Sequence, residues 1–356
     1  MRMVHVRTAY RLLIPLSFLG YSAFYLASTA DAFRYSLQTW ALEKTQLSDG
    51  SLTKAIDSAF ANLAPHQAMA VDLAGSLRFA LFGELKPGAV RGRDGYLFAE
   101  TEIVFSSQVP SRVAFAATQI SKVKDILRSM GIELILVPLP TKMDVERHHH
   151  DYQDAARVAE QAYADLISQA QSLGVRTVDA RSVWQGAGSG GNLTHRTDQH
   201  WTVHGAAVVA QAVARVVGPQ DAGLVKLTPT PETLFFQGDL ARFIGSEDVS
   251  ASMGYPVEVI RPLLASYAPP LAIADPDYTL VGTSESVDTR WSFAALLESN
   301  LQARVDNKAM SGLGPLYPMW QAIRQMNDSS PRTVIWEFPV GAIFKDNELY
   351  VENALP

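Results

Sequence analysis

The chain has 356 residues, of which 47% are hydrophobic and 19% charged, and these fractions are typical of a folded globular protein and exclude a disordered one. Its net charge of −6 argues against a nucleic-acid-binding protein, which would carry a clustered basic surface. The sequence contains no cysteine, so disulfide scaffolds, thiolate metal sites and cysteine nucleophiles are excluded as well.

An uncharged apolar run, Leu12–Ala30, follows three arginines near the start of the chain. A helix of this length spans about 28 Å, which is close to the hydrocarbon thickness of a bilayer. The arginines before the run and Asp31 after it place the N-terminus in the cytoplasm and the rest of the chain outside. Residues 1–32 are therefore expected to be a cytoplasmic tip and a transmembrane signal anchor. A cleaved signal peptide is the alternative, because Ala30-Asp31-Ala32 has the small-x-small form of a cleavage site.

Helices and strands alternate along most of the remaining chain, after a helical lead-in expected at residues 33–87. The expected helices are Val109–Met130, Ala155–Leu173, Thr202–Val217, Trp291–Leu301 and Pro315–Met326. The expected strands are Ile132–Val137, Val175–Val178, Tyr278–Val281, a short one from Val305, and Thr333–Phe338. This order predicts an α/β domain over residues 88–345, with a mainly parallel sheet and helices on both faces. Residues 219–277 break the alternation and are expected to be an irregular insertion, and residues 346–356 a tail.

Ser284 is a candidate nucleophile. It follows the strand expected at Tyr278–Val281 and precedes a helix, and Gly282 allows a tight turn between the two. Such a turn exposes a side chain at the carboxyl edge of a parallel sheet, and its backbone N–H groups can stabilise an oxyanion. A serine in this position can also serve only as a helix cap, so the residue alone leaves both interpretations open.

Asp198 and His200 are candidates for the base that such a serine needs. A histidine can take the serine proton when a carboxylate orients its ring, and a turn at these residues would bring the two side chains together. The residues alone leave three alternatives: a helix cap at Asp198, a packed histidine, or a metal-binding pair. The metal pair is disfavoured because no third ligand lies nearby in helical register.

Three further residues are candidates for contact with substrate. Lys142 follows a strand end near the expected cleft and could contact a polar or anionic group, although an ordinary surface lysine is the alternative. Trp201 and Trp291 could stack on sugar rings if they are exposed, and otherwise belong to the core or the cleft wall. The run His148–His150 is interpreted as a solvated loop, because three consecutive side chains point in different directions. No metal site is therefore expected.

Several stretches, taken together and in this order, resemble the alginate O-acetyltransferase family, the SGNH-hydrolase-like proteins of AlgJ and AlgX type. The resemblance runs from about Gly88 to Phe338. The stretches that carry it are Gly92–Phe98, Val137-Pro138 with Lys142, Arg196–Thr202 with Gly205-Ala206, Leu280–Ser286, Trp291–Phe293, Gly312–Pro315 and Ile335–Pro339. The single anchor and the overall length look more like the membrane-anchored AlgJ branch.

The resemblance implies an SGNH-hydrolase-like fold and a catalytic triad in which Ser284 is the nucleophile, His200 the base and Asp198 its orienting carboxylate. It implies an oxyanion site formed by the backbone N–H groups of Ser284 and Gly312. The implied reaction passes an acetyl group through an ester on Ser284 to a sugar hydroxyl, and it requires no metal or organic cofactor.

The resemblance also implies a setting for this reaction. The enzyme would sit in the bacterial inner membrane by a single pass, with its catalytic domain in the periplasm. It would act on an exopolysaccharide such as an alginate-like polymer or acetylated cellulose. A membrane-bound O-acyltransferase would supply the acetyl group, alongside other polymer-modification proteins. Two alternatives stay open: a carbohydrate acetyl esterase with the same triad, and a non-catalytic scaffold that binds polymer.

Overall fold

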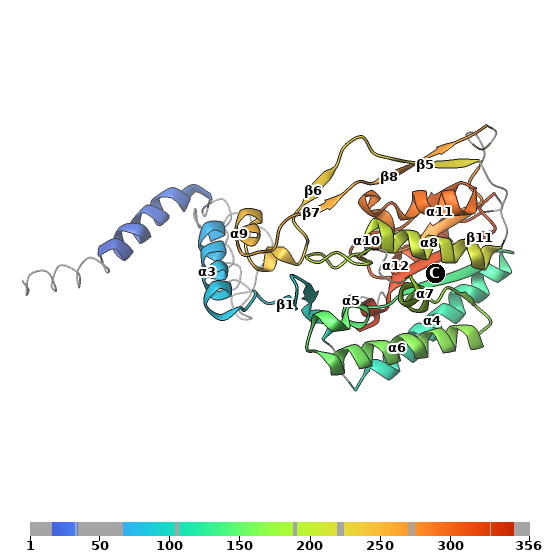
Figure 1. The fold of residues 1–356 in the computed structure, drawn as a ribbon, viewed down its shortest axis with the longest axis horizontal. Helices are drawn as coiled ribbons and strands as arrows, with labels where there is room; N and C mark the ends of the chain where they lie inside the picture. Colours follow the sequence, from blue (N-terminus) through green and yellow to red (C-terminus); the bar gives the residue numbers. More distant parts are fainter. Residues whose placement is uncertain are drawn as a thin grey trace, which may run out of the picture. The chain divides into compact units, whose positions relative to one another are not determined.

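The computed structural model describes residues 16–32, 34, 67–103, 107–187, 191–218, 224–269, 271, 275–327 and 329–344. The chain divides into two compact units, Met1–Leu77 and Arg78–Pro356. The sheet, its helices and the candidate site all belong to the second unit, and Figure 1 labels several of its elements.

The N-terminal segments are described only in part. Residues 16–32 are helical, and the helix α3 covers Gln67–Phe82. Among the residues that the structure describes, no helix is both long enough and apolar enough to cross a membrane. The expected membrane segment Leu12–Ala30 begins before the first described residue. Most of the expected lead-in and the whole tail at 346–356 also lie outside the described residues.

A five-stranded parallel sheet forms the centre of the second unit. Its strands lie in the order β10 (Val305–Asn307), β9 (Tyr278–Val281), β11 (Thr333–Pro339), β3 (Glu133–Leu139) and β4 (Arg176–Thr177). Every neighbouring pair is parallel. The expected α/β class, the parallel sheet and each of its five strands are therefore confirmed.

Helices cover both faces of this sheet. One face packs against α4 (Val109–Ser129), α6 (Gln153–Ser172) and α12 (Leu316–Gln325). The opposite face packs against α7 (Ala180–Gly186), α8 (Val203–Val217) and α11 (Phe293–Leu301). The five expected helices are thus present as α4, α6, α8, α11 and α12, with ends that lie within two residues of the expected ones.

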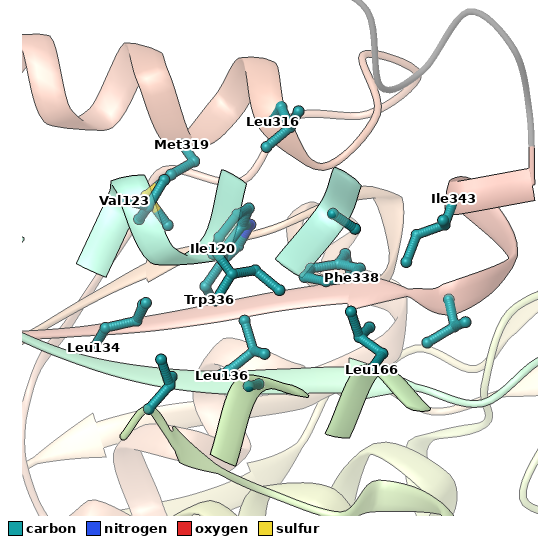
Figure 2. Close-up of a cluster of buried hydrophobic side chains, with 14 of the residues drawn as sticks. Ile120, Val123, Leu134, Leu136, Leu166, Leu316, Met319, Trp336, Phe338 and Ile343 are labelled. Carbon is teal, nitrogen blue, oxygen red and sulfur yellow. The ribbon is translucent and has the colours of Figure 1, made fainter. Parts of the chain in front are cut away.

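The sheet is apolar on both faces because its two central strands carry almost continuous hydrophobic runs. Successive side chains of a strand point to opposite faces. Leu134 and Leu136 of β3 therefore join Trp336 of β11 in the cluster under α4, as Figure 2 shows. Ile135 of β3 and Ile335 of β11 lie in the cluster on the other face. Burial on both faces is typical of a central parallel sheet.

The segment expected to be an irregular insertion contains regular structure, so that expectation was wrong for its described residues. Strand β5 (Val225–Pro229) pairs antiparallel with β8 (Leu263–Tyr267), and β6 (Leu234–Phe236) pairs antiparallel with β7 (Glu258–Ile260). Between them lie the short helices η3 (Ala241–Phe243) and α9 (Glu247–Ser252). These strands have three to five residues and are partly exposed, so their sequences lack the long apolar run that predicts a buried strand.

The carboxyl ends of the central strands meet at one edge of the sheet, as parallel strands require. Strand β9 is followed there by α10 (Ser284–Val287), and β3 by α5 (Lys142–Val145). The turn that holds Gly312 follows β10 at the same edge. These segments come from distant parts of the sequence and form the walls of the candidate site.

Candidate active site

The serine at position 284 lies on a sharp turn between strand β9 and helix α10. Thr283 is the N-cap of α10, and Ser284 is the first residue of the helix. Gly282 is required before them, because a Cβ atom there would collide with the carboxylate of Glu337 and the hydroxyl of Ser286. The turn therefore places Ser284 at the carboxyl edge of the sheet, as its position after an apolar strand predicted.

An unbroken chain of hydrogen bonds joins Asp198, His200 and Ser284. The Nδ1 atom of His200 lies 2.6 Å from Oδ1 of Asp198, and its Nε2 atom lies 2.9 Å from Oγ of Ser284. The backbone N–H of Asp239 donates to the second carboxylate oxygen of Asp198 at 2.9 Å. The structure thus brings together the three residues that the sequence marked as base, orienting carboxylate and nucleophile.

The imidazole ring of His200 is fixed by packing as well as by hydrogen bonds. The indole ring of Trp291 stacks on it, with ring centres 5.1 Å apart and planes 23° apart. Trp291 has no exposed surface, so it forms a rigid wall behind the histidine. The ring can therefore neither rotate nor flip without breaking several contacts at once.

The charges around His200 favour its protonated form. Burial alone would lower its pKa, but the carboxylates of Glu285 and Asp198 outweigh this effect and raise the pKa of His200 to about 9. Burial likewise opposes ionisation of Asp198. The hydrogen bonds and the charge of His200 nevertheless hold the pKa of Asp198 well below its ordinary value. The arrangement can accept a proton at His200 and stabilise the resulting positive charge.

Two further carboxyl groups lie buried next to this chain, and the sequence reasoning did not identify either of them. Burial raises the pKa of Glu285 to about 8, and the charge of Glu337 adds to the increase. Burial also raises the pKa of Glu337 to about 7. Glu285 follows Ser284 in the same turn, and Glu337 accepts hydrogen bonds from that turn.

A cavity of about 340 Å³ opens above Ser284 and His200. Gly312 lines it together with them, in a left-handed turn with φ of 74°. Neither the backbone N–H of Ser284 nor that of Gly312 donates to another of the described residues. The cavity thus offers an attacking hydroxyl, a base and two N–H groups with no acceptor among the described residues, which together are the groups that acyl transfer requires.

Lys142 is among the residues that line the cavity, but its side chain is buried and its amine is bonded to the protein itself, so a contact with substrate stays a prediction. Its Nζ atom donates to the carbonyl oxygens of Leu97, Arg196 and Asp198, at 2.7, 3.0 and 2.9 Å. An ammonium group has three hydrogens, and all three are used in these bonds. Burial lowers the pKa of Lys142 to about 8. The residue supports the loop that carries Asp198.

Trp201 and Trp291 are also buried, so neither can stack on a sugar ring as proposed. Trp201 is 1% exposed, and its indole N–H donates to the backbone oxygen of Glu285. Trp291 lies behind His200. The alternative interpretation of both residues, core or cleft wall, is correct.

The histidine run at 148–150 is not a uniformly solvated loop. Only His148 is exposed, while His149 stacks on Tyr96 at 3.8 Å and the ring of His150 is hydrogen-bonded to the Met143 carbonyl. Ligand atoms of Glu146, His148 and His149 lie within 4.8 Å of one another, a spacing that could hold a metal ion. Asp198, His200 and Asp239 form a second such group, but Asp198 and His200 are already hydrogen-bonded to each other, and His200 also to Ser284.

The insertion supplies partners that local sequence patterns do not reveal. Besides Asp239, it provides Glu258, whose carboxylate accepts from the backbone N–H and the hydroxyl of Thr197 at 2.7 and 2.8 Å. Gly238 packs so closely on the Thr197 carbonyl that a Cβ atom there would collide with it. The loop that carries Asp198 and His200 is therefore held by residues that follow it by about 40 to 60 positions.

Known proteins resemble this chain over most of its length. A family model described as an SGNH hydrolase-like domain, acetyltransferase AlgX, matches residues 89–340. The "probable alginate O-acetylase AlgJ" of Azotobacter vinelandii is 29% identical over 311 residues, which are 83% of this chain and 80% of that protein. The protein of the same description from Pseudomonas aeruginosa is 27% identical over 319 residues, with coverage of 83% and 80%. The solved O-acetyltransferase domain of Pseudomonas putida AlgJ is 27% identical and superimposes with a TM-score of 0.65, covering 73% of this chain and 94% of that one.

Proposed function

Because the chain belongs to the AlgX family of SGNH hydrolase-like acetyltransferases, we propose that it is a polysaccharide O-acetyltransferase. It transfers acetyl groups to sugar hydroxyls of an extracellular polysaccharide through an acetyl ester on Ser284. The observation that carries this proposal is the hydrogen-bonded chain from Asp198 through His200 to Ser284. The relatives named alginate O-acetylases support a polysaccharide as the acceptor.

The first half of the reaction loads the enzyme. The Oγ atom of Ser284 attacks the carbonyl carbon of the acetyl donor while His200 Nε2 takes the hydroxyl proton. The carbonyl oxygen becomes an oxyanion, and the N–H groups of Ser284 and Gly312 are the donors that would stabilise it. The intermediate collapses, and the leaving group departs with the proton from His200. Asp198 keeps Nδ1 protonated, so Nε2 is free to accept.

The second half of the reaction repeats these steps with a new nucleophile. An acceptor hydroxyl attacks the acetyl ester and gives its proton to His200, and Ser284 recovers this proton as the sugar ester leaves. Water competes with the sugar at this stage. Transfer therefore depends on holding the acceptor hydroxyl against His200, and the 340 Å³ cavity offers the space for one sugar residue.

The place of the enzyme in the cell forms part of the proposal. Helix 16–32 exposes large apolar side chains, among them Leu16 at 62% and Phe18 at 70%. These side chains support a single N-terminal anchor in the inner membrane, with the catalytic unit in the periplasm. An acetyl donor on that side must be supplied across the membrane, and a membrane-bound O-acyltransferase is the proposed source. The acceptor is an alginate-like polymer or acetylated cellulose.

The test compares the purified full-length chain with its Ser284→Ala variant. Each is incubated with an activated acetyl ester and a series of oligosaccharides, and mass spectrometry follows acetyl groups on the protein and on each oligomer. Acetylated oligomers made only by the wild type would establish transfer and identify the acceptor. Acetate released at one rate, whatever glycan is present, would indicate an acetyl esterase. Equal behaviour of wild type and Ser284→Ala would leave the polymer-binding scaffold as the function.

A further inference from the structure

A carboxylate lies inside the central strand of the sheet, where a charged group is least expected. Glu337 of β11 has no exposed surface, and its chain neighbours Trp336 and Phe338 are buried with it. Burying a carboxylate is unfavourable unless hydrogen bonds or a cation compensate for the lost water. Among the described residues, no lysine, arginine or histidine forms an ion pair with it. Its compensation comes mainly from hydrogen bonds, with a smaller contribution from the charge of His200.

All the hydrogen bonds that Glu337 accepts from the described residues come from the turn that carries Ser284. The backbone N–H of Thr283 donates to it at 3.0 Å, the Thr283 hydroxyl at 3.1 Å and the Ser286 hydroxyl at 2.6 Å. Ser284 lies between these two donors in the sequence. Gly282, just before them, has no room for a Cβ atom because the same carboxylate occupies that space. The Glu337 side chain therefore binds the turn on both sides of Ser284.

We infer that Glu337 is a positioning residue for Ser284: its carboxylate, anchored in the central strand, fixes the turn so that the serine hydroxyl meets His200. This inference rests on the proposed function. Strand β11 pairs with both β3 and β9, so it is held more rigidly than the turn itself. The hydrogen bonds from Thr283 and Ser286 hold the turn against this strand, and the Oγ atom of Ser284 lies 2.9 Å from Nε2 of His200.

A positioning role for Glu337 predicts a change in the maximal rate of acetylation but not in the half-saturating ester concentration. Glu337 does not line the cavity, so its loss should leave binding of the ester unchanged. A displaced nucleophile reacts slowly even when substrate is bound, and a shift of about 1 Å costs on the order of 100-fold in rate. The maximal rate of Ser284 acetylation should therefore fall, while the half-saturating ester concentration stays constant.

The experiment uses full-length Glu337→Leu, Glu337→Gln and Ser286→Ala, with Ser284→Ala as the blank. Glu298→Gln is the matched control. That residue is also a buried glutamate, but it accepts from Tyr267 and Val305 and lies outside the catalytic cavity. The acetylation rate is measured with 4-nitrophenyl acetate in a single turnover, and the melting temperature is measured for every variant.

We expect Glu337→Leu to lower the maximal acetylation rate about 100-fold with an unchanged half-saturating concentration. Glu337→Gln should retain part of the rate because its amide oxygen still accepts from Thr283. Ser286→Ala should lower the rate less than Glu337→Leu, and adding it to Glu337→Leu should have little further effect, because the two residues share one interaction. Glu298→Gln should keep the wild-type rate.

Three outcomes would overturn the inference. The first is wild-type rates in folded Glu337→Leu, and the second is a loss in Glu298→Gln as large as in Glu337→Gln. The third is a raised half-saturating concentration with an unchanged maximal rate. If Glu337→Leu does not fold, the comparison of Glu337→Gln and Ser286→Ala with Glu298→Gln decides in the same way. A Ser284→Ala blank as active as the wild type would instead refute the proposed function itself.

Discussion

The Nε2 atom of His200 lies 2.9 Å from the Oγ atom of Ser284, although the two residues are 84 positions apart in the sequence. Each side chain is held in place independently of the other. The histidine is fixed by Asp198 and Trp291, and the serine by its turn. A proton can pass between them without prior rearrangement of either element.

Replacing Asp198 by asparagine should lower kcat about 10⁴-fold, because an amide nitrogen facing His200 would favour the tautomer that cannot accept the serine proton. The measurement is steady-state release of 4-nitrophenol from the acetyl ester. Asp94→Asn is the matched control, since Asp94 contacts the ring of His149 at 3.0 Å on the surface. A similar loss in both variants would argue against a specific role of Asp198.

Activity should rise with pH until the alkaline range. His200 must be neutral to take a proton, and its pKa is raised to about 9, so the active fraction grows as pH increases towards that value. The dependence of kcat/KM on pH, measured with an ester that does not itself ionise, should show a single rising limb with its midpoint near this pKa. A plateau already reached near neutral pH would contradict the prediction.

Replacing Glu285 by glutamine should move that limb to lower pH. The charge of Glu285 is the largest of the influences that raise the pKa of His200, and glutamine removes the charge while keeping an oxygen for the Trp201 N–H. Activity at neutral pH should therefore increase relative to activity at pH about 9. If the midpoint of the kcat/KM profile is the same in Glu285→Gln and in the wild type, Glu285 carries no charge when His200 titrates, and the prediction is wrong.

Replacing Lys142 by methionine should destabilise the protein by about 3 kcal/mol, because three buried carbonyl groups lose the donor that satisfies them. Denaturant unfolding measures this change. The activity of the folded fraction should fall through kcat, since one of those carbonyls belongs to Asp198. An unchanged stability with a raised KM would instead favour the original interpretation of Lys142 as a substrate contact.

The sequence allowed the sheet and the central residues of the site to be predicted because both depend on local patterns. The strand Tyr278–Val281 is largely apolar, and Gly282, two residues before Ser284, marks the turn after it. Lys142 shows the limit of such reasoning: its place at a strand end gives the correct edge of the sheet but not the direction of its side chain. That direction depends on carbonyl groups contributed by Leu97 and Arg196.

The roles of Asp239, Glu258 and Glu337 could not be predicted for a related reason. Asp239 and Glu258 bind residues 41 and 61 positions away, and Glu337 binds two residues that are 54 and 51 positions away. Nothing in the sequence next to each residue identifies these partners. The sequence does contain one indication of Glu337: it is the single acidic residue in the largely apolar strand Thr333–Pro339, where a charged side chain is not expected.

The backbone N–H of Asp239, which completes the hydrogen bonding of Asp198, has a consequence for how this enzyme can be altered. The segment that carries it connects the histidine to the serine in the sequence and forms its own antiparallel ribbons, so it resembles a cassette that could be exchanged to change specificity. It is not a separable module. Any replacement must return an N–H group to the same oxygen and a close-packed glycine to the Thr197 carbonyl, or the exchange will disable the base while leaving the sheet intact.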